Sequence, residues 1–70
     1  MDEFRLKGET IDLVQLLKAA HLCGSGGEAK MIIEDGLVMV DGEIETRKRK
    51  KIRAGQTVEF NNEKISVVST

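Results

Sequence analysis

Hydrophobic and polar positions follow two different periods along this chain. The first segment, Phe4–Lys7, alternates apolar and polar residues and predicts a short half-buried strand or an extended arm. Apolar residues then recur at the i, i+3, i+4 and i+7 spacing of one helix face, at Leu13, Leu16, Leu17 and Ala20. We expect Thr10 to cap this helix, Asp12 to lie in its first turn, and the helix to end by Gly24.

A second helix has the clearest start signal in the chain. The segment Ser25–Glu28 reads Ser-Gly-Gly-Glu and fits a capping box, in which the serine side chain accepts from the glutamate amide and the glutamate reaches back. Ala29, Ile32 and Ile33 form a narrow apolar stripe, and Gly36 is placed as the left-handed residue that ends the helix. The two helices and the short turn between them predict a helix-turn-helix-like pair.

From Leu37 onward the period of the pattern is two. Leu37–Val40 is a β-rich run, Asp41-Gly42 is the dipeptide that type I′ hairpin turns prefer, and Glu43–Thr46 returns as the partner strand. The later elements are, in order, a turn at Ala54-Gly55, a strand at Thr57–Phe60, a turn at Asn61-Asn62 and a strand at Lys64–Val68. This order predicts an α+β fold, in which the two-helix helix-turn-helix-like pair packs on a small antiparallel β-sheet.

Composition indicates one ordinary globular domain over residues 1–70. Hydrophobic residues make up 40% of the chain and charged residues 33%, which excludes a disordered segment. No apolar run approaches the roughly 18 residues that span a membrane, and the acidic start is unlike a secretory signal. The single cysteine, Cys23, favours a reducing, cytoplasmic setting. We expect no metal and no cofactor, because His21 and Cys23 have no partners at ligand spacing.

Charge is strongly segregated, although the net charge is only −1. Six of the 11 basic residues lie in one run, which leaves five basic against 12 acidic residues elsewhere, a local balance of −7. A folded domain tolerates such a run where it is well solvated or meets an anion, and neutralising phosphates releases condensed counterions. The run therefore predicts polyanion binding through Arg47, Lys48, Arg49, Lys50, Lys51 and Arg53. A solvated loop or a nuclear-localisation patch is the alternative, and charge alone does not distinguish RNA from DNA.

The start of the second helix is another candidate for anion binding. Its residues are Ser25, Gly26, Gly27 and Lys30. Glycines at the first helical positions leave the backbone amides uncovered, and the partial positive charge of a helix N-terminus favours phosphate. Glu28 works against this role unless the capping box holds it aside. The alternative is that this segment only caps the helix and turns the chain.

Aromatic residues are scarce, and this scarcity limits the mode of binding. Phe4 and Phe60 are the only ones, too few for platforms on which bases stack. Any RNA contact should therefore follow the backbone and the shape of the RNA. We do not expect an enzyme, because the acidic residues are spread out and so short a chain lacks the walls of a catalytic pocket.

The order of the parts resembles the RNA-binding domain named after small-subunit ribosomal protein four, also called the alpha-L motif. The resemblance extends from Thr10 to Val68 and is strongest to the stand-alone bacterial, YbcJ-like members. The segments that carry it are Ser25-Gly26-Gly27, Ala29-Lys30, the stretch from Glu34 to Gly42, Glu45-Thr46-Arg47-Lys48-Arg49 and the stretch from Ala54 to Val58. It implies binding to structured RNA, typically ribosomal or transfer RNA, through the helix pair and the adjoining basic loop.

Carried over by position, the resemblance implies that Ser25, Gly26, Gly27 and Lys30 face the RNA beside the basic run. One departure matters, because many family members have an arginine just after the serine, where this chain has Gly26. Exposed amides and Lys30 would have to substitute for it.

These observations predict a monomeric, cytoplasmic RNA-binding module that docks through phosphate contacts and catalyses nothing. Association with the ribosome is one setting that fits it. A protein-interaction adaptor, whose basic loop binds an acidic partner, is the alternative hypothesis. DNA is a rival polyanion, and only the resemblance favours RNA over it.

Overall fold

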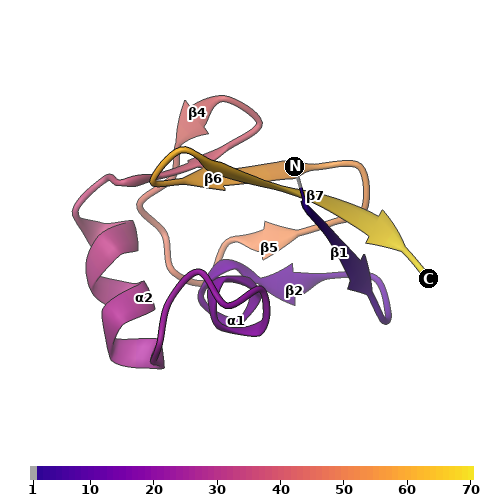
Figure 1. The fold of residues 1–70 in the computed structure, drawn as a ribbon, viewed down its shortest axis with the longest axis horizontal. Coiled ribbons are helices and arrows are strands. Elements are labelled where there is room, and N and C mark those ends of the chain that lie inside the picture. The colour runs from indigo at the N-terminus through magenta and orange to yellow at the C-terminus, as the bar shows by residue number, and fades with distance from the viewer. Residues whose placement is uncertain (1) are drawn as a thin grey trace.

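The computed structural model describes residues 2–70, and within them two helices lie on one side of a five-stranded sheet (Figure 1). The elements in chain order are β1 (Asp2–Leu6), β2 (Ile11–Asp12), α1 (Leu13–Ala19), α2 (Gly26–Glu34), β3 (Val38–Val40), β4 (Glu43–Ile44), β5 (Lys51–Ile52), β6 (Thr57–Phe60) and β7 (Glu63–Ser69). In Figure 1 the helices and the short β2–β5 pair lie below the larger sheet. The predicted α+β class is confirmed.

The larger sheet is mixed, whereas the sequence predicted an antiparallel one. Its strand order is β1-β7-β6-β3-β4, and every neighbouring pair is antiparallel except β1 and β7. Those two run parallel from the Asp2–Ile65 pair to the Leu6–Ser69 pair. Parallel strands need a long connection between them, and here nearly the whole domain lies between β1 and β7 in the chain. The first segment is thus a sheet strand and not a free arm.

The start of α1 differs from the prediction. Thr10 does not cap it, because Ile11 and Asp12 form β2, which pairs with Ile52 and Lys51 of β5. The helix begins at Leu13, and its N-cap residue Asp12 makes no side-chain capping bond. A long-range strand pair therefore replaces the first turn that the sequence predicted.

The ends of α2 follow the sequence closely. The side chain of Ser25 accepts a hydrogen bond from the Glu28 amide at 3.2 Å. Gly36 adopts a φ of 76°, and its amide donates to Ile33 while the next amide donates to Ile32. This is the Schellman arrangement, in which a left-handed residue lets the chain turn back over the last helical carbonyls. Positive φ values of 53° and 85° at Asp41 and Gly42 likewise confirm the predicted hairpin turn.

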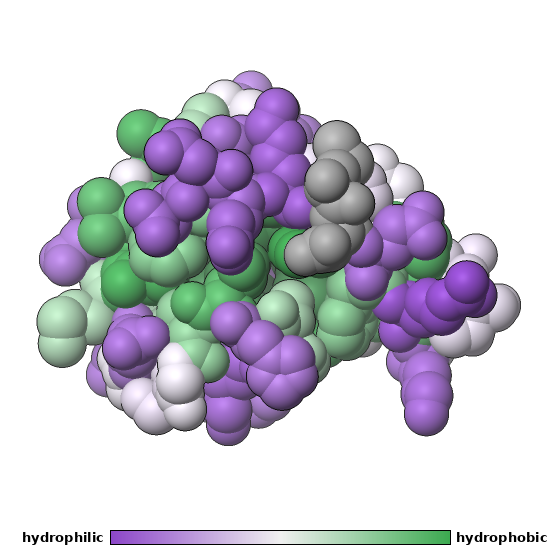
Figure 2. All heavy atoms as spheres, in the orientation of Figure 1, coloured by the Kyte–Doolittle hydropathy of each residue, from purple (hydrophilic) through white to green (hydrophobic). Residues whose placement is uncertain are grey.

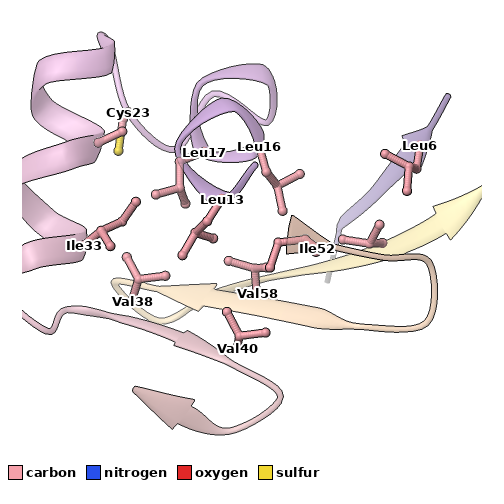
Figure 3. Close-up of a cluster of buried hydrophobic side chains, with 12 residues drawn as sticks. Leu6, Leu13, Leu16, Leu17, Cys23, Ile33, Val38, Val40, Ile52 and Val58 are labelled. Carbon is pink, nitrogen blue, oxygen red and sulfur yellow. The ribbon is translucent and has the colours of Figure 1, made fainter. Parts of the chain in front are cut away.

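The core lies between the helices and the sheet. Leu13, Leu16 and Leu17 of α1 are fully buried, and in Figure 3 they point toward Ile33 of α2 and the valines of β3 and β6. Figure 2 shows hydrophobic atoms gathered between hydrophilic atoms above and below, where the two layers meet on this face. This packing places the end of α2 beside the segment that joins β4 to β5, which contains the first four residues of the basic run.

Candidate nucleic-acid interface

The basic run has a backbone that is tied to the start of α1. We call residues Arg47–Lys51 the basic loop. The amide of Leu13 donates to the Lys50 carbonyl oxygen at 2.9 Å, and the amide of Val14 donates to that of Lys48 at 3.1 Å. The first amides of a helix have no partners within the helix, so the loop carbonyls satisfy them. The loop therefore has a fixed backbone from which its cationic side chains extend.

Two cations of the basic loop have acidic neighbours. Nε of Arg47 lies 3.0 Å from Oε2 of Glu45, and this contact lowers the pKa of the Glu45 carboxyl and raises that of Arg47. Nζ of Lys51 lies 2.5 Å from Oδ1 of Asp12. The Arg47 and Lys51 side chains are 72% and 63% exposed. Their partners Glu45 and Asp12 are only 14% and 27% exposed, but the cations themselves reach solvent and can turn to an external anion.

An open hollow of about 650 Å³ lies along the basic loop, and we call it the basic groove. Its lining consists of Glu34 at the end of α2 and the consecutive residues Thr46, Arg47, Lys48, Arg49, Lys50 and Lys51. A hollow lined mostly by one sign of charge concentrates counterions and favours anionic ligands.

Lys30 of α2 and Lys48 of the basic loop meet at one surface. The Lys30 side chain lowers the pKa of the Lys48 ammonium, first through direct contact within hydrogen-bonding reach and then through charge repulsion. Lys30 is exposed and Lys48 is half-buried. The fold therefore brings the second helix and the basic loop together, and their role in binding stays a prediction.

This like-charge contact leads to a stability prediction. Replacing Lys48 by Gln should raise the melting temperature slightly at low salt, because the repulsion by Lys30 that it removes exceeds the attraction by Glu34. Thermal unfolding followed by circular dichroism at low and high salt measures the effect, which should fade as salt screens the charges. A lower melting temperature in the variant would show that Lys48 stabilises the free domain instead.

The opening of α2 is only partly available to an anion. Glu28 reaches back as predicted, but its Oε1 accepts from the Gly24 amide at 3.1 Å and not from the N-cap residue. Ser25 and Gly27 are exposed, and Gly26 is half-buried. The Glu28 carboxylate is thus held beside the helix opening, where it offsets part of the positive field.

Lys18 lies beside Gly26, and the sequence interpretation missed it. A Cβ added at Gly26 would lie 3.6 Å from Cδ and 3.9 Å from Nζ of Lys18. The α1 cation thus lies next to the first residue of α2. The only sequence signal was a lysine in the last turn of α1, and this signal does not reveal which part of the chain the lysine will meet.

Arg53 lies apart from the other predicted site residues. It follows β5 in the turn toward β6, where its amide donates to Oε1 of Gln56 at 2.8 Å, and it does not line the basic groove.

Burial, and then the charge of Glu28, raise the pKa of Cys23 in the core. Within residues 2–70 no three His, Cys, Asp or Glu side chains lie close enough to share a metal ion. No helix in that range is long and apolar enough to cross a membrane.

We compared the chain with known protein families and with individual proteins of similar sequence. The family model that describes the S4 domain matches residues 4–68 of this chain. The chain belongs to the S4 domain family. Over 59 residues this S4 domain is 49% identical to YbcJ of Escherichia coli (strain K12), with 84% of each chain covered. Over 56 residues it is 43% identical to a tyrosine–tRNA ligase of Ralstonia nicotianae, covering 80% of this chain and 14% of the ligase.

Solved structures share the fold of this S4 domain. The solution structure of E. coli YbcJ, described as revealing an alpha-L motif involved in RNA binding, superposes with a TM-score of 0.76. Its sequence is 48% identical, and the match covers 97% of this chain and 87% of that one. The 30S ribosomal protein S4e of Thermoplasma acidophilum gives a TM-score of 0.70 at 27% identity, covering 83% of this chain and 31% of S4e.

Proposed function

We propose that this S4 domain is an RNA-binding module that docks on structured RNA through phosphate contacts and catalyses no reaction. The observation that carries the proposal is the basic groove, where Glu34 of α2 lies together with the cations of the basic loop. Lys30 of α2 acts on Lys48 beside it, so α2 and the basic loop contribute to one surface. The likeness to YbcJ, whose motif is described as involved in RNA binding, supports RNA as the polyanion.

A phosphate placed between Lys30 and Lys48 explains why two ammonium groups are held together. In the free domain they repel each other, and an anion between them converts that repulsion into attraction to both. The exposed Arg49 and the half-buried Lys50 extend the same surface along the groove. Lys18 extends it toward the opening of α2. Binding gains its free energy from counterion release, which carries little base preference.

The partner that fits best is a folded RNA of the ribosomal or transfer class. Relatives include a ribosomal protein and a tyrosine–tRNA ligase, although this chain spans only part of each. The scarcity of aromatic side chains favours recognition of backbone and shape over base stacking. Residues 1–70 would act as one monomeric domain in the cytoplasm, with Ser25, Gly26, Gly27 and Lys30 beside the cations of the basic run.

The salt dependence of RNA affinity tests this proposal. If about four phosphates are neutralised, the logarithm of the affinity should fall with the logarithm of salt concentration at a slope of about −3 to −4. Fluorescence anisotropy with a labelled RNA hairpin, titrated at several salt concentrations, gives this slope. A flat salt response, or no binding at low salt, would contradict docking through phosphates.

A further inference from the structure

Glu34 is an acidic residue on the wall of the basic groove. It is the last residue of α2, its side chain is exposed, and it faces the groove together with Thr46 and the loop cations. Its negative charge acts on Lys48, whose pKa it raises against the larger lowering by Lys30. Among residues 2–70, however, no cation lies within ion-pair distance of the Glu34 carboxylate. The groove thus contains a hydrogen-bond acceptor that is not engaged.

The stability of α2 does not explain this placement. The carbonyl end of a helix carries a partial negative charge, so a carboxylate in the last turn is disfavoured there. The last turn of α2 contains Glu34 and no basic residue. Attraction to Lys48, and to Lys30 four residues earlier on α2, offsets part of this cost. An acid on the wall of a groove that binds phosphate still calls for a further reason.

That reason lies in the chemistry of the nucleotide. A carboxylate repels phosphate and, when ionised, only accepts hydrogen bonds, so the part of an RNA that it can bind is a hydrogen-bond donor. A groove whose cations follow the phosphates also brings each ribose close to its wall. The 2′-hydroxyl is a donor that RNA has and DNA lacks. Resting on the proposed function, we infer that Glu34 accepts a hydrogen bond from a ribose 2′-hydroxyl and so makes this surface select RNA over other polyanions.

The test compares one RNA hairpin with its 2′-O-methyl counterpart of the same sequence. The methylated hairpin keeps its phosphates and bases but lacks the hydroxyl donor. We expect wild-type protein to bind the unmodified hairpin about five- to tenfold more tightly, which lies within the range of a typical net hydrogen bond. In Glu34→Ala this ratio should fall to about twofold or less, as the hydrogen bond is lost and repulsion of the phosphates is relieved. Glu34→Gln keeps a carbonyl acceptor and should retain part of the ratio.

Asp35→Asn is the matched control. Asp35 is the exposed neighbour of Glu34, and its replacement removes the same charge without altering the groove lining. It should strengthen binding of both hairpins equally and leave their ratio unchanged. If Glu34→Ala also leaves the ratio unchanged, Glu34 acts only as a charge, or meets a donor on a base, and the inference is wrong while RNA binding stands. If wild-type protein binds neither hairpin, the proposed function itself fails.

Discussion

Replacing Lys48, Arg49 and Lys50 together by glutamine should lower the affinity for a structured RNA about 30- to 100-fold at low salt. These side chains line the basic groove without an ion-pair partner among residues 2–70, so each is available to phosphate. Each lost phosphate contact should also make the slope against salt less steep by about one unit. The carbonyl groups that cap α1 belong to the backbone and remain in the variant.

Arg47 is left in place in this variant for a structural reason. It pairs with Glu45, so its removal would leave an unpaired carboxylate next to the basic loop as well as subtract a cation. A triple variant that includes Arg47 would then mix repulsion by Glu45 with the loss of a phosphate contact. The chosen variant measures the loss of cations alone.

The matched control removes three positive charges from the other edge of the sheet. Arg5 and Lys7 lie in and just after β1, the edge strand opposite β4, and Lys64 lies in β7, the strand next to β1. All three are exposed and none lines the basic groove, so replacing them by glutamine should weaken RNA binding less than about threefold, because salt screens charges that do not contact the RNA. Equal losses in both triple variants would show that net charge, and not the basic groove, sets the affinity.

Local signals predicted the parts of the fold that depend on a few neighbouring residues. Gly36 and the Asp41-Gly42 pair need positive φ values, which their residue types supply at low cost. Ser25 offers a side-chain acceptor to the free amide of Glu28 at the helix start. Each signal is complete within one turn of the chain, so it can be recognised without knowing the tertiary structure.

The features that the sequence did not predict depend on contacts between distant segments. Asp12 was expected inside a helix, but its backbone pairs with Lys51, 39 residues away. The contact of Lys18 with Gly26 depends on how the turn after α1 folds. In the sequence, nothing distinguishes Glu34 from other exposed glutamates of a helix, because only the fold shows that the basic loop lies beside it. The residue types of the candidate site were thus readable in the sequence, but their neighbours were not.

Replacing Leu17 by Ala should have the largest effect on stability. Leu17 is fully buried in α1, and in Figure 3 it points into the space between α1 and α2, near Cys23 and Ile33. Removing its side chain should cost about 2–5 kcal/mol, because the lost burial and the cavity both destabilise the folded state. A domain of 70 residues has a total stability of only about 4–10 kcal/mol. We therefore expect the melting temperature to fall by about 10–30 °C in thermal unfolding.

Leu37→Ala provides the control, since the same atoms are removed from a side chain that is 55% exposed. It should change the free energy of unfolding by about 0.5 kcal/mol or less. RNA offers a second measurement, because a ligand that binds only the folded state stabilises it by about 2.7 kcal/mol at 100 times its dissociation constant. Excess RNA hairpin should thus restore about 10 °C or more of the melting temperature lost in Leu17→Ala. A variant that RNA fails to stabilise would have lost the arrangement of α1 against α2 on which the basic groove depends.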